Sequence, residues 1–391
     1  MINVNECHSL LASIPSSDKT ERVPLNESLG RVLAQDILAD TDQPPFNKSA
    51  MDGYACALSD LPGPLVVAGR IAAGEFTEKK LDAGNCYRIF TGAPVPVGAD
   101  CIIMQEYTKD LDGSVLFTQK ETKSNICYQG EDLKSGEVAI KAGALIQPQH
   151  IAVMAGFGIT QPYVAVKPRV AILCSGSELV EPSAMPCKAK IRNSNAYQLI
   201  GQLSAAGGEA DYLGIVPDDR ETITNCITNI VGKYDVIVVT GGASVGDYDF
   251  MPDVLTTLGA TIHFSALNIQ PGKPILFATL GNTHILGLSG NPVSSYLQFL
   301  LVAKPLLFRL SGCTLPSLKI VKTPLAEAVK RKKSNRQLYI PVTFNPSGFA
   351  NLIPFNGSAH ITALAGIDGF AILDVDVNEA MENQLINVVL V

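Results

Sequence analysis

The sequence predicts a multidomain protein in which a doubly wound α/β domain is flanked by β-rich small domains. Strand-like and helix-like runs alternate over residues 168–312, which is typical of a parallel sheet with helices on both faces, a three-layer α/β/α arrangement. Short β-like runs separated by Gly and Pro dominate residues 44–140 and 313–391, which favours small β domains. A length of 391 residues is enough for two to four domains, at about 150 residues each.

These changes along the chain predict four domains. The predicted segments are 1–43 together with 141–167 as an elongated linking domain with helices, 44–140 as a small β-rich domain, 168–312 as the α/β domain and 313–391 as a C-terminal β domain. In the linking domain, Pro148 stands at a first helical position and Gly156 follows an apolar turn. This pattern predicts a short helix over 150–155 that opens at Pro148 and is closed by Gly156 and Gly158.

The α/β segment shows its elements in order. Apolar composition predicts strands over 170–174, 212–216, 235–240, 275–280 and 284–288. Two helices are expected to begin at capping residues, one at Asn195 and one at Asp218, which forms a D-x-x-E capping box with Glu221. Two more are expected to begin at Pro252 and at Asn291-Pro292, and the last of these reaches about residue 308. Because Gly281 and Asn282 separate the last two strands, these strands are expected to form a hairpin.

Composition and charge exclude several classes of protein. Apolar residues make up 47% of the chain, so it can bury a large core and is not disordered. A net charge of −7 opposes a nucleic-acid coat or an anionic-membrane binder, because both need surplus positive charge. Nine cysteines, with no pair closer than 13 residues, indicate free thiols in a reducing compartment. The longest apolar run, 296–308, is too short to span a bilayer, and no secretory signal is evident, so a cytoplasmic location is expected.

Four loops are expected at the ligand-binding edge of the sheet, which in an open parallel sheet lies beyond the carboxyl ends of the strands. These loops are 175–178, 217–219, 241–249 and 288–292. Their glycines allow the backbone to approach a ligand closely, and free N–H groups at helix starts favour phosphate. Neither a Walker A motif nor G-x-G-x-x-G follows a strand, which excludes ordinary phosphate-loop and dinucleotide sites.

The loop 241–249 is the strongest candidate for a functional segment. Its small and acidic residues are Gly241, Gly242, Ser244, Gly246, Asp247 and Asp249. Such a composition is costly for folding, so its place at the predicted ligand edge favours a function. Asp218 has two open interpretations, a helix cap and a functional carboxylate. The five histidines have no triad or metal-ligand partner in sequence, and the basic run 330–333 is interpreted as a solvated turn.

Nine stretches of the sequence occur in the order found in one enzyme family. They are PPFNKSAMDGYA, FTGAPVPVGAD, GEDLKSG, SGSELV, NSNAYQL, VPDD, TGGASVGDYDF, QPGKP and LSGNPVS. On these motifs the chain resembles the molybdopterin molybdenumtransferases, the family of bacterial molybdenum-insertion enzymes and of the gephyrin C-terminal domain. The resemblance extends over nearly the whole chain.

The resemblance implies a homodimer with an active cleft between subunits, in which the linking domain also dimerises and the α/β domain binds molybdopterin. The family reaction inserts molybdate, the co-substrate, into adenylylated molybdopterin. The phosphoanhydride is cleaved, AMP leaves, and the dithiolene sulfurs bind molybdenum. Mg²⁺ assists the reaction, and other proteins of molybdenum-cofactor biosynthesis are implied as partners.

The resemblance also implies a role for each matching residue. The catalytic positions are Asp52, Thr91, Asp132 and Lys273, and the metal positions are Asp218 and Asp249. The substrate-binding positions are Glu178, Asp218, Gly241, Gly242, Ser244, Gly246, Asp247, Gly272, Gly290, Asn291, Pro292, Ser294, Arg336 and Ser358. Of these, Ser294, Arg336 and Ser358 are expected near the molybdate. The chemistry agrees, because carboxylates can hold Mg²⁺ against phosphate oxygens and cations can neutralise an entering oxyanion.

The sequence departs from the family pattern at two positions where a cationic residue is usual. Ala266 and Gln270 stand where the family usually has lysines. A charge-assisted hydrogen bond is worth roughly 1.5–3 kcal/mol, so the absence of both lysines weakens an anion site. We therefore expect activity to require high concentrations of Mg²⁺ or molybdate. The alternative hypothesis is therefore a divergent paralogue that binds molybdopterin, cofactor or a partner protein with weak or no insertion activity. A scaffold related to gephyrin and an ATP-dependent adenylyltransferase are further alternatives, and the additional β segments oppose the adenylyltransferase.

Overall fold

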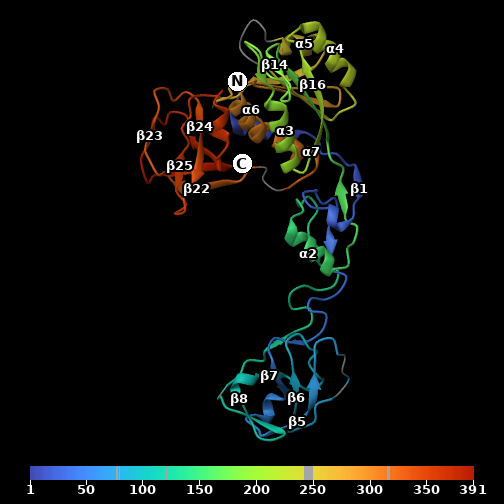
Figure 1. Cartoon of the computed structure of the whole chain (residues 1–391). Coiled ribbons are helices and arrows are strands. Elements are labelled where there is room, and N and C mark those ends of the chain that lie inside the picture. The colour runs from blue at the N-terminus through green and yellow to red at the C-terminus, as the bar shows by residue number, and fades with distance from the viewer. Residues whose placement is uncertain (76–77, 79, 120, 242–249, 315–317) are drawn as a thin grey trace. The chain divides into compact units, whose positions relative to one another are not determined.

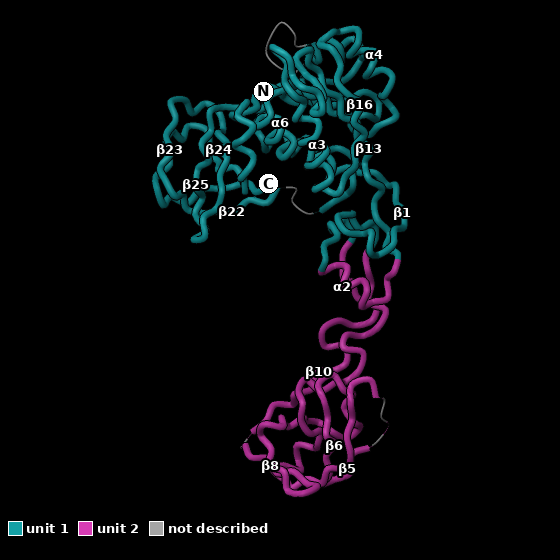
Figure 2. Tube along the Cα trace, viewed as in Figure 1, with its two compact units in different colours: residues 1–35, 142–148, 161–391 teal, residues 36–141, 149–160 magenta. Residues whose placement is uncertain are grey.

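The chain leaves one structural unit near residue 35, builds a second unit and returns to the first (Figure 2). The computed structural model describes residues 1–75, 78, 80–119, 121–241, 250–314 and 318–391 (Figure 1). The first unit comprises residues 1–35, 142–148 and 161–391, and the second comprises 36–141 and 149–160. The finer division into four domains stays a prediction.

A six-stranded sheet forms the core of the second unit. Its strands are β4 (Gly53–Cys56), β5 (Leu65–Ile71), β6 (Asn85–Ile89), β7 (Cys101–Met104), β8 (Thr108–Asp110) and β9 (Ser114–Phe117), in the order β7-β4-β6-β5-β9-β8. The β5–β6 pair is parallel and the other pairs are antiparallel. Ala55 and Ile102 pack in one buried cluster, whereas Cys56 and Ile103 pack in another, so both faces of this β-rich unit are covered.

Smaller elements complete the second unit. They are the pair β2 (Ile37–Leu38) and β11 (Val138–Ile140), the pair β3 (Lys48–Ser49) and β10 (Ile126–Cys127), the 3₁₀ turns Leu58–Asp60 and Gln105–Tyr107, and helix α2 (Pro148–Gly156), whose first residue belongs to the first unit. The helix predicted from Pro148 to Gly156 is thereby confirmed.

The first unit contains the predicted α/β domain. Its sheet has the order β16-β13-β17-β21-β20-β18, with β13 (Arg169–Ser175), β16 (Glu209–Val216), β17 (Val236–Thr240), β18 (Thr261–Ala266), β20 (Pro274–Leu280) and β21 (Thr283–Leu288). The first four strands in this order are parallel. Strand β20 is antiparallel to both β21 and β18, which confirms the predicted hairpin and makes the sheet mixed at that side.

Helices cover both faces of this sheet. They are α1 (Val4–Ser13), α3 (Asn195–Ala205), α4 (Arg220–Ile230), α5 (Met251–Thr257), α6 (Pro292–Gln298) and α7 (Lys304–Leu310). Val170 of β13 shares a buried cluster with residues of α3 and α6, whereas its neighbour Ala171 shares one with residues of α4 and α5. Because successive strand residues point to opposite faces, an apolar run such as this one requires a helix layer on each side.

Two helix starts differ from the predicted caps. Asp219, not Asp218, caps α4, because its side chain accepts a hydrogen bond from the Thr222 N–H at 2.8 Å. Asn195 lies inside α3, and Asn193 accepts from the Ala196 N–H at 3.2 Å instead. The D-x-x-E pattern therefore marks the correct helix but the wrong capping residue, which leaves the Asp218 carboxylate available for other contacts.

The long helix predicted after Asn291 consists of α6, a π-helical turn over Phe299–Ala303 and α7. Residues 292–310 are long and apolar enough to cross a membrane, but 83% of the most apolar window is buried inside the protein. Burial of this kind fits the core helix of a folded domain. It supplies much of the main hydrophobic cluster of the first unit.

The last part of the chain, together with β19 from the α/β segment, forms a six-stranded sheet. Its order is β19-β24-β26-β28-β22, with β19 (Ile269–Gln270), β22 (Ile320–Pro324), β24 (Gln337–Phe344), β26 (Gly369–Leu373) and β28 (Leu385–Leu390), and β25 (Ala350–Leu352) pairs with β24 beside it. The remaining described elements are the strand pairs β1 (Thr20–Arg22) with β12 (Tyr163–Ala165), β14 (Leu179–Val180) with β15 (Ile191–Arg192), and β23 (Val329–Lys330) with β27 (Glu379–Ala380), and the 3₁₀ turns Leu25–Glu27 and Ile361–Leu364. The sheet confirms the predicted β character of the C-terminal segment.

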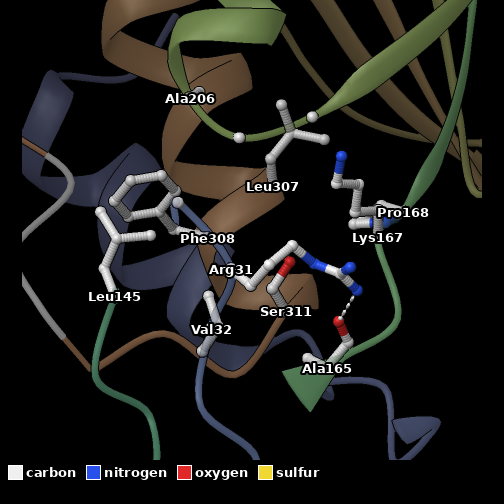
Figure 3. Close-up of a pocket in the computed structure, with 13 residues that line it drawn as sticks. Arg31, Val32, Leu145, Ala165, Lys167, Pro168, Ala206, Leu307, Phe308 and Ser311 are labelled. Carbon is white, nitrogen blue, oxygen red and sulfur yellow. Dashed lines mark hydrogen bonds between the residues drawn. The ribbon is translucent and has the colours of Figure 1, made fainter. Parts of the chain in front are cut away.

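Buried Arg31 ties the N-terminal segment to β12, just before the α/β domain (Figure 3). Its guanidinium donates to the Ala165 carbonyl at 2.8 Å and forms an ion pair with Glu21. Beside it, Gly207 approaches Gly30 so closely that an added Cβ would lie 2.2 Å from the Gly30 carbonyl oxygen. Only glycine fits at position 207, which also has a left-handed φ of +78°.

Candidate functional site at the carboxyl edge of the sheet

The carboxyl ends of the parallel strands bring the predicted loops together. The Gly176 N–H, just after β13, donates to the Val216 carbonyl at the end of β16, at 3.2 Å. The Gly241 N–H, just after β17, donates to the Leu288 carbonyl at the end of β21, at 3.3 Å. These contacts continue the sheet by one residue and fix four loop starts along one edge, as expected for a ligand site in an open α/β sheet.

Asp218 is held by donors from the neighbouring loop. The Ser175 hydroxyl donates to one carboxylate oxygen, and the Ser177 N–H donates to the other at 3.3 Å. Ser175 ends β13 and Ser177 follows it, and the neighbouring strand β16 ends two residues before Asp218. The Asp218 carboxylate is therefore oriented at the carboxyl edge of the sheet and does not cap α4. This favours the functional interpretation of Asp218.

Close backbone packing explains the glycine at position 241. Its φ is +82°, and a Cβ there would lie 2.0 Å from the Ser175 carbonyl oxygen. The corresponding position on Gly290 would be 3.7 Å from the Gly241 Cα, so these two glycines lie side by side. Main chain, not side chain, therefore forms this part of the site, and a ligand can approach it closely.

Gln298 connects the last loop to the segment that carries Lys273. This fully buried side chain accepts from the Ser289 N–H at 2.8 Å and donates to the Gly272 carbonyl at 2.8 Å. Its amide also lies 2.6 Å from the Pro274 carbonyl oxygen. One amide thus satisfies three backbone groups and fixes the spacing between two candidate loops.

Sheet topology places Lys273 and Ala266 at the same edge. Strand β18 ends at Ala266 and runs parallel to β21, because each is antiparallel to β20. Strand β20 begins at Pro274, directly after Lys273, and runs the other way. The end of β18 and the start of β20 therefore both lie at the carboxyl edge, where the Lys273 side chain is exposed.

A cavity of about 510 Å³ opens at this edge, within the size range of small-molecule sites. It is lined by Ser175, Glu178, Leu179, Ile191, Arg192, Asn193, Ser194, Asn195, Thr240, Gly241, Gly290, Asn291, Pro292, Ala359 and Ile361. Asn195 donates to the Gly290 carbonyl at 2.9 Å, while its buried side-chain oxygen has no hydrogen-bond partner among the described residues. A ligand that donates a hydrogen bond would satisfy this oxygen.

Sequence reasoning missed several residues of this cavity. Asn193 and Asn195 belong to the NSNAYQL motif and Arg192 directly precedes it; the sequence predicts only a helix cap at Asn195 and no role for the other two. Asn193 donates to the Tyr212 hydroxyl at 2.9 Å, and that hydroxyl donates to Glu181 at 2.7 Å. Burial, followed by the hydrogen bond to Glu181, raises the pKa of Tyr212, so its phenol stays protonated at neutral pH. The sequence signal that could have identified this part of the cavity is the pair of asparagines, Asn193 and Asn195, two residues apart.

The residues expected near molybdate lie in the same unit. Ser294 is buried at the start of α6, and its Cβ is 3.4 Å from the ideal Cβ position on Gly272. The Ser358 carbonyl accepts from the Val293 N–H at 3.1 Å, so Ser358 lies beside the same helix start. Arg336 is half-buried next to β19, with its guanidinium 3.5 Å from the Ile269 carbonyl oxygen. The roles of these residues remain predictions.

The other predicted catalytic residues belong to the second unit. Asp52 precedes β4 and Thr91 follows β6, and these strands are antiparallel neighbours. The Thr91 N–H and hydroxyl both donate to one Asp52 oxygen at 2.7 Å. These two hydrogen bonds, with a smaller contribution from Arg88, hold the pKa of the Asp52 carboxyl below its usual range. Asp132 lies in a different turn, where its N–H donates to the Gln43 carbonyl at 2.9 Å.

Five candidate residues lie outside the described part of the chain. They are Gly242, Ser244, Gly246, Asp247 and Asp249. Among the residues that the structure describes, no group of three or more His, Cys, Asp or Glu side chains could hold a metal ion. Asp218 still fits a magnesium ligand set, since each of its oxygens keeps a lone pair beyond the hydrogen bond it accepts.

Comparison with known proteins decides which family this architecture represents. Residues 2–158 match the family described as the MoeA N-terminal region (domain I and II), and residues 171–309 match the family described as probable molybdopterin binding domain. A molybdopterin molybdenumtransferase of Staphylococcus epidermidis (strain RP62A) is 32% identical over 385 residues, which cover 95% of this chain and 91% of the relative. The chain belongs to the molybdopterin molybdenumtransferase family.

Further relatives of this family agree over the full length. A molybdopterin molybdenumtransferase of Staphylococcus aureus (strain COL) is 32% identical over 375 residues, covering 93% of this chain and 89% of the relative. The crystal structure of a molybdopterin biosynthesis moeA protein from Pyrococcus horikoshii OT3 matches with a TM-score of 0.85 and 29% identity, covering 100% of both chains. The predicted family resemblance and fold class are therefore confirmed.

The departures from the molybdenumtransferase pattern lie next to one another in the fold. Ala266 ends β18, and Gln270 lies in β19, which pairs with Leu338 of β24. Arg336 is thus two residues from the partner of Gln270. The guanidinium of Arg336 contacts this strand through the Ile269 carbonyl, at 3.5 Å.

Proposed function

We propose that the protein inserts molybdate into adenylylated molybdopterin, with release of AMP, to form molybdenum cofactor. The full-length similarity to molybdopterin molybdenumtransferases supports the activity. The single structural observation that carries the proposal is the 510 Å³ cavity at the carboxyl edge, because it joins close backbone at Gly241 and Gly290 with polar side chains. The comparisons give no support to the alternative of a divergent, inactive paralogue.

In this proposal, main-chain groups and asparagines bind the pterin part of the substrate. The left-handed backbone at Gly241 removes side-chain bulk from the cavity wall. Asn195 offers a buried carbonyl oxygen with no protein donor in the described structure, which suits an N–H group of a heterocycle. Because the Tyr212–Glu181–Asn193 contacts hold the neighbouring wall, the asparagines need little reordering when the substrate binds.

The anionic parts of the substrates require cations at the same edge. Lys273 is exposed there and can neutralise a phosphate or molybdate oxygen by a charge-assisted hydrogen bond. Ser294, Ser358 and Arg336 are proposed to hold the molybdate, supported by their place beside Gly272 and β19. Asp52, Thr91 and Asp132 are proposed to contribute from the second unit.

Magnesium is proposed as the divalent cation. Asp218 would hold it, together with Asp249 from outside the described residues. When bound, the ion would neutralise phosphate oxygens as the phosphoanhydride is cleaved. The protein's part is to orient the Asp218 carboxylate through the Ser175 and Ser177 donors.

Assembly and location complete the proposal. We propose a cytoplasmic homodimer that also contacts other proteins of molybdenum-cofactor biosynthesis. All nine cysteines are free thiols, which is usual in a reducing compartment. Light scattering of the purified protein tests the dimer: a monomer at micromolar concentration would contradict it.

The activity is tested by supplying purified protein with adenylylated molybdopterin, molybdate and Mg²⁺. We expect AMP release together with formation of active cofactor, measured by reconstitution of a cofactor-free molybdoenzyme. Omission of molybdate and of Mg²⁺ gives the matched controls. Turnover no greater than that of a blank without protein, from a folded sample, would contradict the proposal.

A further inference from the structure

The opposite edge of the same sheet carries a second, basic cavity. Three neighbouring parallel strands, β13, β17 and β21, begin there. A cavity of about 210 Å³ lies against their amino ends and is lined by Ser17, Lys19, Val166, Lys167, Pro168, Arg169, Gly232, Lys233, Tyr234, Asp235, Asn282, His284 and Leu310. Lys167 and Pro168 also line the smaller pocket beside Arg31 (Figure 3). The carboxyl-edge site shares none of these residues.

Positive charge is concentrated in this cavity, although the chain as a whole carries a net charge of −7. Four cationic side chains line it, against one carboxylate, that of Asp235. The Asp235 carboxylate already accepts a hydrogen bond from the Arg169 N–H, at 2.7 Å. Lys19 and Lys233 are exposed and form no ion pair within the described residues. Cations that gather without counter-charges repel one another, and a bound anion removes that repulsion.

Other contacts show which groups are committed and which remain for a ligand. Arg169 stacks over the Tyr234 ring, 5.2 Å from its centroid, and Lys167 pairs with Glu209 at 2.7 Å. Lys19 and Lys233 therefore provide the uncommitted charge. His284 also lines the cavity, but its Nδ1 is buried and is not counted among the groups that contact a ligand.

The size and walls of the cavity limit the ligand. Its 210 Å³ is below the range of about 300–1,000 Å³ that holds nucleotide- or drug-sized ligands. Arg169 occupies the face of Tyr234, so that ring is not available for stacking on a base. We propose that this amino-edge cavity binds a small multivalent oxyanion of the phosphate or pyrophosphate class, held mainly by Lys19 and Lys233. The site is separate from the proposed molybdate-insertion site and does not depend on that function.

Isothermal titration calorimetry of the full-length protein with sodium pyrophosphate and, separately, with sodium phosphate tests the proposal. Sodium chloride keeps ionic strength constant, because salt screens exposed charges. We expect binding by the wild-type protein that Lys19→Gln/Lys233→Gln weakens by about tenfold or more, the effect of losing two charge-assisted contacts. Lys19→Arg/Lys233→Arg should retain binding. Absence of binding to either anion by the wild type would overturn the proposal.

Two control variants distinguish this site from other sources of anion binding. Lys109→Gln/Lys322→Gln removes the same charge from exposed strand positions elsewhere, and its affinity should match that of the wild type. Lys273→Gln removes a cation from the carboxyl edge and should also leave this binding unchanged. If Lys273→Gln abolishes binding while Lys19→Gln/Lys233→Gln does not, the anion belongs to the carboxyl edge and the proposal is wrong. Circular dichroism verifies that each variant is folded.

Discussion

The two edges of the six-stranded sheet in the α/β domain differ in their chemistry. The carboxyl edge has a 510 Å³ cavity with glycine backbone and an oriented carboxylate, Asp218. The amino edge has a 210 Å³ cavity with four cationic side chains. At the carboxyl edge, helices such as α4 and α6 begin shortly after strands, so the partial positive charge of these helix starts lies at that edge.

The difference shows how each edge recognises charge. At the amino edge, helices end before strands begin; α4 ends at Ile230, three residues before Lys233. Helix carboxyl ends carry partial negative charge, which attracts cations but does not bind anions. An anion site at the amino edge therefore depends on side-chain charge, whereas the carboxyl edge uses backbone geometry and a few polar side chains. The following variants test this contrast, beginning with the largest expected effect.

Replacing the oriented carboxylate should have the largest effect on activity. Asp218→Asn keeps the size of the side chain but removes its charge, and we expect kcat/KM to fall about 1,000-fold, equivalent to about 4 kcal/mol. Steady-state AMP release measures this. Asp219→Asn is the matched control, because asparagine also caps helices well and activity should be retained. Equal activity of both variants would place the site elsewhere.

Glycine substitutions compare the backbone at the two edges. Gly241→Ala should lower the free energy of unfolding by about 3 kcal/mol, because a left-handed φ and a Cβ 2.0 Å from the Ser175 oxygen are both unfavourable. Gly232→Ala at the amino edge has a similar φ of +78° but no atom within 4 Å of the added Cβ. Gly232→Ala should lower the free energy of unfolding by about 1–2 kcal/mol. Urea denaturation separates the two, and identical losses would contradict the packing argument.

Gln298 tests whether one buried amide holds the carboxyl edge together. Gln298→Leu leaves the Ser289 N–H and the carbonyls of Gly272 and Pro274 without this partner. We expect the free energy of unfolding to fall by about 2 kcal/mol and the KM for molybdate to rise. Gln202→Leu, at a half-buried amide that donates to the Tyr296 carbonyl, should cost less than about 1 kcal/mol. A smaller loss for Gln298→Leu than for Gln202→Leu would refute this interpretation.

Restoring positive charge should strengthen anion binding at the carboxyl edge. Ala266→Lys/Gln270→Lys introduces lysines at both departures from the family pattern, and we expect the apparent KM for molybdate to fall about tenfold, equivalent to about 1.4 kcal/mol. Thr261→Lys, at the exposed other end of β18, is the control and should not change it. An unchanged KM in the double variant would show that these positions do not limit molybdate binding.

The smallest predicted effect is a pH dependence at the amino edge. Burial, followed by the nearby charge of His263, lowers the pKa of His284, which Asp235 opposes. The unfolded chain therefore binds more protons than the folded chain below about pH 6.5, so stability is lost as the pH falls from there toward the lowered pKa. His284→Gln should flatten the stability curve in that range, measured by urea denaturation at pH 7.5 to 5. An equally steep curve in the variant would refute this.

Much of the fold was predictable because local patterns and burial agree. Fully apolar strands such as 236–240 can only be covered on both faces, which fixes the three layers. The hairpin at Gly281 and the helix opened by Pro148 follow from turn and cap chemistry. The capping residue of α4 was assigned wrongly because Asp218 and Asp219 are adjacent and both can cap. The contact of Asp219 with the Thr222 N–H and that of Asp218 with Ser175 distinguish them.

The candidate site was predictable in part. Motif order identified the loops and the carboxylates, and strand ends predicted that the loops meet at one edge. The contacts of Gln298 and Asn195 were not predictable, because their partners lie at least nine residues away in sequence or on another element. The basic cavity was also missed, since Lys19, Lys167 and Lys233 are scattered singly along the chain.

The sequence by itself determined the layered α/β domain, the β-rich flanks and the family, because periodicity, turn residues and ordered motifs are local properties. Tertiary structure alone decided that the Asp218 carboxylate faces Ser175, that Gly241 must lack a side chain, and that distant lysines line one cavity. These facts depend on which strands are neighbours, and neighbours in a sheet are set by global packing rather than by local sequence.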